Sequence, residues 1–220
     1  MRRGVVSEVF ATESAAQRYG DLLAGSPLHL VTERAAKALS DTVNPAGLVA
    51  VCSVPDTSLS DVLAGRPTLL AVPVGVSEPG NAGTLIRVAD AMGADAVVLA
   101  GHSVDPYNGK CLRASAGSIF SVPVVSESDG VGVVTQIRDA GLQVLATALD
   151  GDVSLDDAEL AVPTAWLFGP EAHGLPADFV DLATHRVHIP MRGGAESLNV
   201  ASAASICLYQ SAQAHRRIGG

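Results

Sequence analysis

The sequence has few aromatic residues, few cysteines and no long apolar run. Aromatic side chains make up only 4% of the 220 residues although 48% are hydrophobic. The core must therefore be built mainly from Val, Leu, Ile and Ala, a composition that favours buried parallel strands. No apolar run approaches the roughly 20 residues needed to cross a bilayer, and no signal-peptide block follows Met1. We therefore expect a globular cytoplasmic protein without a membrane partner.

The few cysteines also exclude two kinds of site. They are far apart, and none has the Cys-x-x-Cys spacing of zinc and redox sites: Cys52, Cys111 and Cys207. Free cysteine often behaves as a small buried apolar side chain, and we expect this of all three. The histidines show no ligand spacing that indicates a site, so we expect no metal.

Basic residues are absent from one long segment, residues 139–185, which carries nine of the 23 acids. The other 14 acids balance all 14 bases. The net charge of −9 argues against a nucleic-acid partner, because phosphate binding normally needs a basic face. The uneven distribution nevertheless permits a locally positive surface for RNA outside that segment. Its candidate residues are Arg2, Arg3, Arg18, Arg34, Arg87, Lys110, Arg113, Arg216 and Arg217.

Turn-forming residues between Pro55 and Pro67 separate two segments of different character. We place a first domain at residues 1–58, a linker at 59–66 and a second domain at 67–220. The pattern of the first domain predicts a small α/β unit, with strands at 5–11, 28–31 and 48–53 and helices at 14–24 and 33–40.

In the second domain, apolar runs of strand length alternate with amphipathic stretches of helix length, as in parallel βαβ units. The predicted strands are 68–74, 96–100, 122–125, 143–148, 165–168 and 186–189, and the predicted helices are 82–92, 110–116, 131–140, 177–183 and 200–216. The fold class is therefore α/β, with a mainly parallel sheet and helices on both faces. Ligands of such sheets bind where loops leave the carboxyl ends of strands, so the informative loops follow Val74, Phe168 and Ile189.

Each of these loops also has an ordinary structural explanation. In the first, Asn81 can cap a helix, and Arg87 can be one more exposed arginine because it points away from the predicted core face. In the second, Glu171 is favoured near a helix N-terminus, although the glycines around it suggest a backbone that approaches a ligand closely. In the third, Ser197 or Asn199 can start the last helix, although apolar flanks would suit an adenine pocket.

Taken together, the three loops resemble the signatures of the SpoU family of SPOUT RNA methyltransferases. The matching segments are Asn81-x-Gly83-x-x-x-Arg87, then Phe168-Gly169-Pro170-Glu171-x-x-Gly174-Leu175, then Ile189-Pro190-Met191 with Glu196-Ser197-Leu198-Asn199-Val200-Ala201. A fourth stretch, residues 110–120, is similar to the segment that family members carry after the second strand. The likeness covers residues 67–220.

The resemblance implies a C-terminal trefoil knot that holds S-adenosylmethionine, and methylation of a ribose 2′-hydroxyl in RNA, with ribosomal RNA preferred to tRNA. The family's cofactor contacts match Gly169, Ile189 and Leu198, with Met191 and Thr147 as further candidates. Its polar active-site residues match Arg87, Asn81, Glu171, Ser197 and Asn199. The expected RNA contacts are Lys110, Arg113 and Ser115.

The resemblance also implies a homodimer and a substrate-binding domain ahead of the knot. The apolar side of the last helix could face the core or a dimer partner: Val200, Ala204, Cys207 and Leu208. Family members usually carry a complete ribosomal-protein-like RNA-binding domain, whereas residues 1–58 begin near its second strand. We therefore expect a partial domain there.

The sequence also bears on several other activities. A SPOUT relative could methylate a base nitrogen, but Arg87 and the Ser197-Leu198-Asn199 triplet favour ribose. A non-catalytic RNA-binding protein could keep this fold, but the intact set of active-site residues argues against it. A dehydrogenase and a serine hydrolase are disfavoured, because neither Gly-x-Gly-x-x-Gly after a strand nor Gly-x-Ser-x-Gly occurs.

Overall fold

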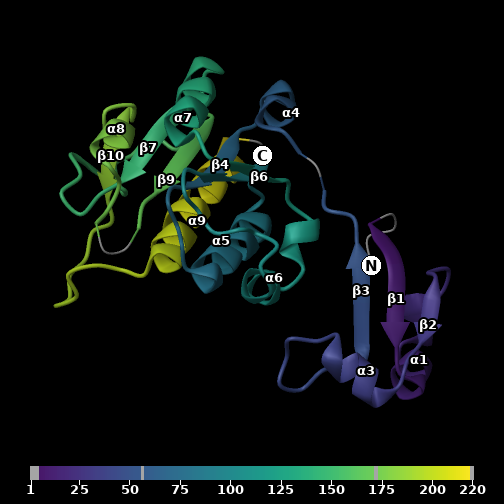
Figure 1. Ribbon diagram of the computed structural model, residues 1–220. Coiled ribbons are helices and arrows are strands. Elements are labelled where there is room, and N and C mark those ends of the chain that lie inside the picture. Colours follow the sequence, from purple (N-terminus) through teal and green to yellow (C-terminus); the bar gives the residue numbers. More distant parts are fainter. Residues whose placement is uncertain (1–4, 56, 171–172, 219–220) are drawn as a thin grey trace. The chain divides into compact units, whose positions relative to one another are not determined.

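The computed structural model describes residues 5–55, 57–170 and 173–218 (Figure 1). The chain divides into two compact units, Met1–Asp56 and Thr57–Gly220. Each unit has its own buried hydrophobic residues, its own sheet and its own helices, so each is described by itself.

The first unit is a small three-stranded α/β structure. Its elements are β1 (Val6–Ala11), α1 (Glu13–Arg18), α2 (Gly20–Leu23), β2 (Leu28–Leu30), α3 (Glu33–Ala38) and β3 (Leu48–Cys52). The strand order is β2-β1-β3, with β1 parallel to β2 and antiparallel to β3. Both α1 and α3 begin after a threonine whose side chain accepts a backbone N–H of the first turn, Thr12 and Thr32. The helix predicted at 14–24 is two short helices, which meet at Tyr19 and Gly20.

The second unit contains a seven-stranded sheet in which every strand pair is parallel. Its strands are β4 (Leu69–Pro73), β5 (Ala96–Ala100), β6 (Val124–Glu127), β7 (Gln143–Thr147), β8 (Val153–Ser154), β9 (Thr164–Phe168) and β10 (His185–His188). Their order is β6-β5-β4-β9-β7-β10-β8. The predicted parallel sheet is confirmed, and each predicted strand lies within two residues of an observed one.

Helices cover both faces of this sheet, as the sequence predicted. They are α4 (Leu59–Ala64), α5 (Pro79–Met92), α6 (Gly109–Ser115), α7 (Gly130–Asp139), α8 (Ala177–Val180) and α9 (Val200–Ile218). Along β4, Leu69 and Ala71 belong to a core that includes residues of α5, α6 and α9, whereas Leu70 and Val72 belong to a core that includes residues of α4, α7 and α8. Figure 1 shows α5 and α9 side by side, in agreement with their many contacts.

The segment predicted to be a linker, residues 59–66, instead contains α4. Ser58 and Asp61 form a capping box, in which each side chain accepts the other residue's backbone N–H. Leu59 is buried and belongs to the same core as Leu70 and Val72. Because this cap and this burial stabilise a helix, the segment packs with the second unit rather than remaining extended.

Strand β10 enters the sheet between two strands that follow one another along the chain. It pairs with β7 on one side and with β8 on the other, although only residues 148–152 connect β7 to β8. The backbone N–H of Ala148 donates to the Val187 carbonyl, and that of Leu155 donates to the His188 carbonyl. A knotted chain requires a later strand, here β10, to lie between two earlier strands that a short loop connects. The trefoil knot itself stays a prediction.

Burial settles two points that the sequence left open. Val200, Ala204, Cys207 and Leu208 of α9 are buried in the core of their own chain. Cys111 and Cys207 are buried as expected, and burial is the main cause that raises the pKa of the first to about 11 and of the second to about 12. Cys52 is only half-buried, because it lies on the edge strand β3.

Among the described residues, no helix is both long enough and apolar enough to cross a membrane.

The packing of α5 on α6 generates a stability prediction. A Cβ added at Gly83 would lie 2.3 Å from the Cys111 carbonyl oxygen and 2.7 Å from the Ala114 Cβ. Gly83→Ala should therefore force the two helices apart and lower the free energy of unfolding by about 1–3 kcal/mol. Urea unfolding followed by the fluorescence of Trp166, the one tryptophan of the chain, reports on this unit.

Thr84→Ala is the matched control, because Thr84 is the next residue of α5 and is exposed. Its stability should change by less than about 0.5 kcal/mol. Equal stability of the Gly83→Ala variant and the unsubstituted protein would contradict the described packing.

Candidate cofactor and active site

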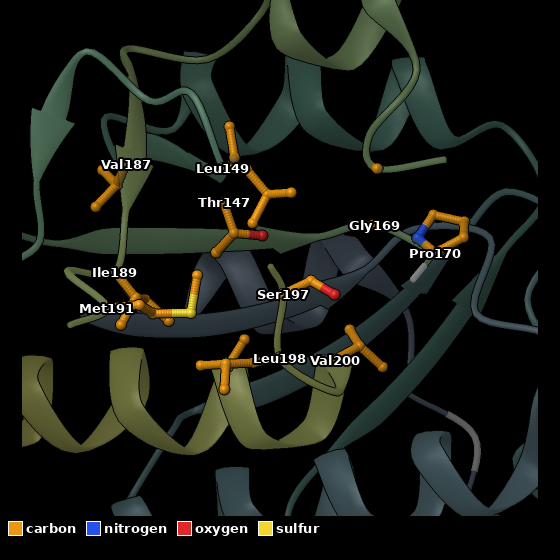
Figure 2. Close-up of a pocket in the computed structure, with 13 residues that line it drawn as sticks. Thr147, Leu149, Gly169, Pro170, Val187, Ile189, Met191, Ser197, Leu198 and Val200 are labelled. Carbon is orange, nitrogen blue, oxygen red and sulfur yellow. The ribbon is translucent and has the colours of Figure 1, made fainter. Parts of the chain in front are cut away.

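A pocket opens where β7, β9 and β10 end and where α9 begins (Figure 2). Its lining residues are Thr147, Ala148, Leu149, Gly169, Pro170, Gly174, Val187, Ile189, Met191, Ser197, Leu198, Val200 and Ala203. All five residues predicted as cofactor contacts lie in this wall: Thr147, Gly169, Ile189, Met191 and Leu198. The carboxyl ends of parallel strands thus form a concave site, which is where such sheets bind ligands.

The wall is mostly apolar, and none of the described residues that line it is charged. Figure 2 shows Ile189 and Met191 on one side, Gly169 and Pro170 on the other, and Ser197 between them. Thr147 is the second hydroxyl residue of the wall, and its hydroxyl donates to the Leu167 carbonyl at 2.9 Å, which ties β7 to β9. The pocket therefore suits a ligand with flat or apolar parts, oriented by backbone groups and few polar side chains.

Gly169 is required by the chain's own backbone. A Cβ at this position would lie 2.6 Å from the carbonyl carbon of Gly174 and 2.6 Å from the Leu175 nitrogen. The turn is closed by the Gly174 N–H, which donates to the Pro170 carbonyl at 2.9 Å, and Gly174 itself has a φ of +66°. The need for glycine at position 169 therefore comes from the returning chain, and the interpretation that this backbone approaches a ligand stays a prediction.

Asn199 joins the third signature to the first. Its Oδ1 accepts the backbone N–H groups of Ala201 and Ser202 at 3.0 and 3.2 Å, so it caps α9 as the ordinary interpretation expected. Its Nδ2 donates to the Oδ1 of Asn81 at 3.0 Å, across 118 positions of sequence. One side chain therefore starts the last helix and connects it to α5.

Asn81 is not the cap of α5. That helix begins at Pro79, and Glu78 is the cap because its carboxylate accepts the Asn81 N–H at 2.7 Å. The helix thus starts three residues earlier than predicted. The Asn81 side chain is left to contact Asn199, so the capping explanation of Asn81 was wrong.

The first loop does not line the pocket in the part of the chain that the structure describes. It follows β4, where the Val74 N–H donates to the Phe168 carbonyl at 2.9 Å. Ser103 then holds it: the Ser103 Oγ accepts the Val76 N–H at 3.2 Å and donates to the Ala100 carbonyl at 2.9 Å. The loop lies beside the second signature and reaches the third through Asn81.

Arg87 is exposed on α5 and is absent from the pocket wall. It lies six residues beyond Asn81, or about 9 Å along the helix axis. Among the described residues it forms no hydrogen bond or ion pair. Ser197 is exposed and lines the pocket, whereas Glu171 lies outside the described residues.

The three predicted RNA contacts differ in their surroundings. Arg113 is exposed on α6. Lys110 is exposed and pairs with Glu78, and this hydrogen bond is the main cause that lowers the pKa of the Glu78 carboxyl. Ser115 is fully buried and its hydroxyl donates to the Leu112 carbonyl at 2.8 Å, so it is not available to a surface ligand. Its assignment as an RNA contact therefore needs correction.

Sequence reasoning missed the contribution of the loop after β7, which supplies Ala148 and Leu149 to the wall. The rule that ligands lie at the carboxyl ends of strands could have found it, because β7 was predicted as a strand of the same sheet.

Within the described residues, no group of three or more His, Cys, Asp or Glu side chains is arranged to hold a metal ion.

Comparison with known proteins agrees with this geometry. The family model of the SpoU rRNA Methylase family matches residues 68–209. The 23S rRNA (guanosine(2553)-2′-O)-methyltransferase RlmP of Bacillus subtilis (strain 168) is 35% identical over 206 residues, which cover 94% of this chain and 80% of that protein. The 23S rRNA (uridine(2479)-2′-O)-methyltransferase of Streptomyces viridochromogenes is 36% identical over 181 residues, which cover 80% of this chain and 62% of that protein.

Solved structures give the same result. The SpoU methyltransferase AviRb from Streptomyces viridochromogenes, in complex with the cofactor AdoMet, superposes with a TM-score of 0.84 at 30% identity, and the match covers 98% of this chain and 84% of that chain. The AdoMet-bound rRNA methyltransferase from Sinorhizobium meliloti gives a TM-score of 0.83 at 28% identity, covering 94% and 80%. The chain therefore belongs to the SpoU family of S-adenosylmethionine-dependent RNA 2′-O-methyltransferases.

Proposed function

We propose that this protein methylates the ribose 2′-hydroxyl of one nucleotide in ribosomal RNA, using S-adenosylmethionine held in the pocket of Figure 2. The observation that carries the proposal is the hydrogen bond between Asn199 and Asn81, which joins the start of α9 at the mostly apolar pocket to the helix that bears Arg87. Two relatives, the enzymes of Bacillus subtilis and Streptomyces viridochromogenes, are 23S rRNA 2′-O-methyltransferases, which supports ribosomal RNA as the substrate.

The residues of the pocket fit this cofactor. Leu149, Ile189 and Leu198 offer apolar surface to an adenine ring and a thioether, and the backbone at the three strand ends offers polar groups to the ring edge. When bound, S-adenosylmethionine supplies a methyl carbon on a positively charged sulfur. An apolar wall disfavours that charge, and the charge disappears during transfer, so these side chains favour the transition state over the ground state.

Arg87 is proposed to act on the other reactant. A guanidinium is a very weak acid that stays protonated in proteins, so its use as a general base would be costly. We therefore assign Arg87 to clamping the phosphate next to the target ribose and to stabilising the negative charge that develops on the 2′-oxygen. The 2′-hydroxyl proton then leaves to the phosphate or to solvent.

The other polar residues are proposed to position these groups. Ser197 lies in the pocket wall and would orient the ribose or Arg87. Asn199 and Asn81 hold α9 and α5 together through their 3.0 Å hydrogen bond. Glu171 is assigned to holding the second signature loop in register.

RNA and a second copy of this chain are the proposed partners. Arg87 is exposed outside the wall of its own pocket, which fits a site completed near a homodimer interface. On α9, Ile206 and Tyr209 are apolar residues that the chain's own core leaves exposed. Arg113 and Lys110 are the proposed RNA contacts of the second unit, while residues 1–58 are proposed to select the RNA.

Incubation with methyl-labelled S-adenosylmethionine and ribosomal RNA tests the proposal, with digestion of the RNA to nucleosides. A labelled 2′-O-methylnucleoside is expected. A labelled base-methylated nucleoside would instead support a base-nitrogen methyltransferase, and RNA binding without methyl transfer would support a non-catalytic protein.

Substitution of Arg87 separates its role from cofactor binding. Arg87→Lys keeps the charge but loses the planar fork, so turnover should fall partially. Arg87→Ala should lower turnover on the order of 100-fold, the effect of removing one preorganised donor. The Kd for S-adenosylmethionine, measured by calorimetry, should barely move in either variant. Unchanged turnover in Arg87→Ala would sink this assignment.

Substitution of Gly169 tests the assignment of the pocket. Gly169→Ala should force Gly169 away from Gly174 and Leu175, at a cost of about 1–3 kcal/mol, and should raise the Kd for S-adenosylmethionine about tenfold. Gly193→Ala is the control, because a Cβ there meets no atom within 4 Å. Calorimetry would contradict the prediction if both variants bound the cofactor as the unsubstituted protein does.

A further inference from the structure

The loop of residues 148–152 connects β7 to β8 and lies directly against β10. A Cβ added at Gly151 would lie 2.6 Å from the backbone nitrogen of His188 and 2.7 Å from the carbonyl carbon of Val187. The Nδ1 of His188 donates to the Gly151 carbonyl at 2.9 Å. Only glycine permits this approach, so the middle of the loop is fixed on the backbone of β10.

Arg186 of β10 reaches both aspartates that flank Gly151. Its Nη1 lies 3.3 Å from the Oδ2 of Asp150, and its Nε lies 3.7 Å from the Oδ1 of Asp152. The backbone N–H of Arg186 also donates to the same Asp152 oxygen at 3.0 Å. Backbone N–H donors, that of Asp152 itself foremost, lower the pKa of the Asp152 carboxyl, and Arg186 lowers it further, so this residue is ionised at neutral pH.

Arg186, Asp150 and Asp152 together form a clamp on the loop. Leu149 directly precedes Asp150 and lies in the pocket wall. It is 68% exposed, so little packing within the chain holds its side chain in place. Figure 2 shows it on the same side of the pocket as Thr147. Because its own packing is slight, its position depends on the backbone of residues 148–152.

We propose that Arg186 is a positioning residue for the cofactor, which holds Leu149 in the pocket wall by pairing with Asp150 and Asp152. The inference rests on the proposed function in one respect, that S-adenosylmethionine occupies the pocket. Arg186 touches neither reactant and acts through the loop. It should therefore affect the binding of the cofactor and leave the methyl-transfer step unchanged.

The size of the effect follows from exposure. The Arg186 side chain is 39% exposed, and those of Asp150 and Asp152 are 83% and 57% exposed. Pairs this exposed are weakened by water and salt. The expected change in cofactor affinity is therefore about two- to fivefold at low salt, and it should disappear near 1 M salt.

The experiment measures the Kd for S-adenosylmethionine by calorimetry, and KM and kcat with RNA, for the full chain. Arg186→Gln should raise the Kd and the cofactor KM about two- to fivefold, with kcat at saturating cofactor unchanged. Arg186→Lys should restore part of the affinity, because it retains the charge. Asp150→Asn with Asp152→Asn should reproduce the loss, and adding Arg186→Gln to that pair should cause no further loss.

The matched control is Arg138→Gln, which removes the same charge from another exposed pair, Arg138 with Asp139, at the end of α7. It should leave Kd, KM and kcat unchanged. Should Arg186→Gln fail to fold, the substitutions of the two exposed aspartates test the same clamp.

The outcomes separate this inference from the proposed function. If the unsubstituted protein binds the cofactor and the Arg186, Asp150 and Asp152 variants bind it equally well, the inference alone is overturned. Additive losses of affinity when these substitutions are combined would also overturn it. A fall in kcat without a rise in KM would also overturn it. Absence of cofactor binding by the unsubstituted protein would overturn the proposed function and the inference with it.

Discussion

The site depends on the parallel pairing of β9 between β4 and β7. Strand β9 is buried at all five positions and is hydrogen bonded to both neighbours, and β10 continues the sheet beyond β7. Because these four strands run in the same direction, their carboxyl ends meet at one edge, and the loops after β7, β9 and β10 enclose the pocket there. The loop after β4 is held at the same edge by the Val74 N–H and by Asn81. A reversal of any one strand would remove its loop from the site.

This arrangement separates two kinds of chemistry. The described part of the pocket wall is mostly apolar and includes no charged side chain, whereas the polar groups assigned to the ribose and its phosphate are Ser197 in that wall and Arg87 on α5. Asn199 connects the two by capping α9 and binding Asn81. Two residues of the acidic segment, Asp150 and Asp152, pair with Arg186 of β10. Part of the net negative charge thus lies on the loop that supplies Ala148 and Leu149 to the pocket wall.

Much of the fold follows from local patterns in the sequence. The apolar runs that become β4, β5 and β9 are buried on both faces, so their composition alone predicted them. Strand β8 has only two residues in an acidic segment and forms by pairing with β10, which no local pattern indicates. Similarly, α4 depends on the burial of Leu59, and the burial of Ser115 depends on how α6 packs against α5. The candidate cofactor residues were predicted through the family resemblance, whereas the tight turn at Gly169 and the clamp at Arg186 required coordinates.

The central claim is that one ligand contacts the ends of β7, β9 and β10 and the start of α9 at the same time. Hydrogen exchange with and without S-adenosylhomocysteine, read by mass spectrometry of peptides, measures this most directly. The account predicts slower exchange in residues 147–150, 173–175 and 187–200 together, and no change in β1, β2 or β3. Binding that slows exchange in only one of these segments, or mainly elsewhere in the chain, would contradict it.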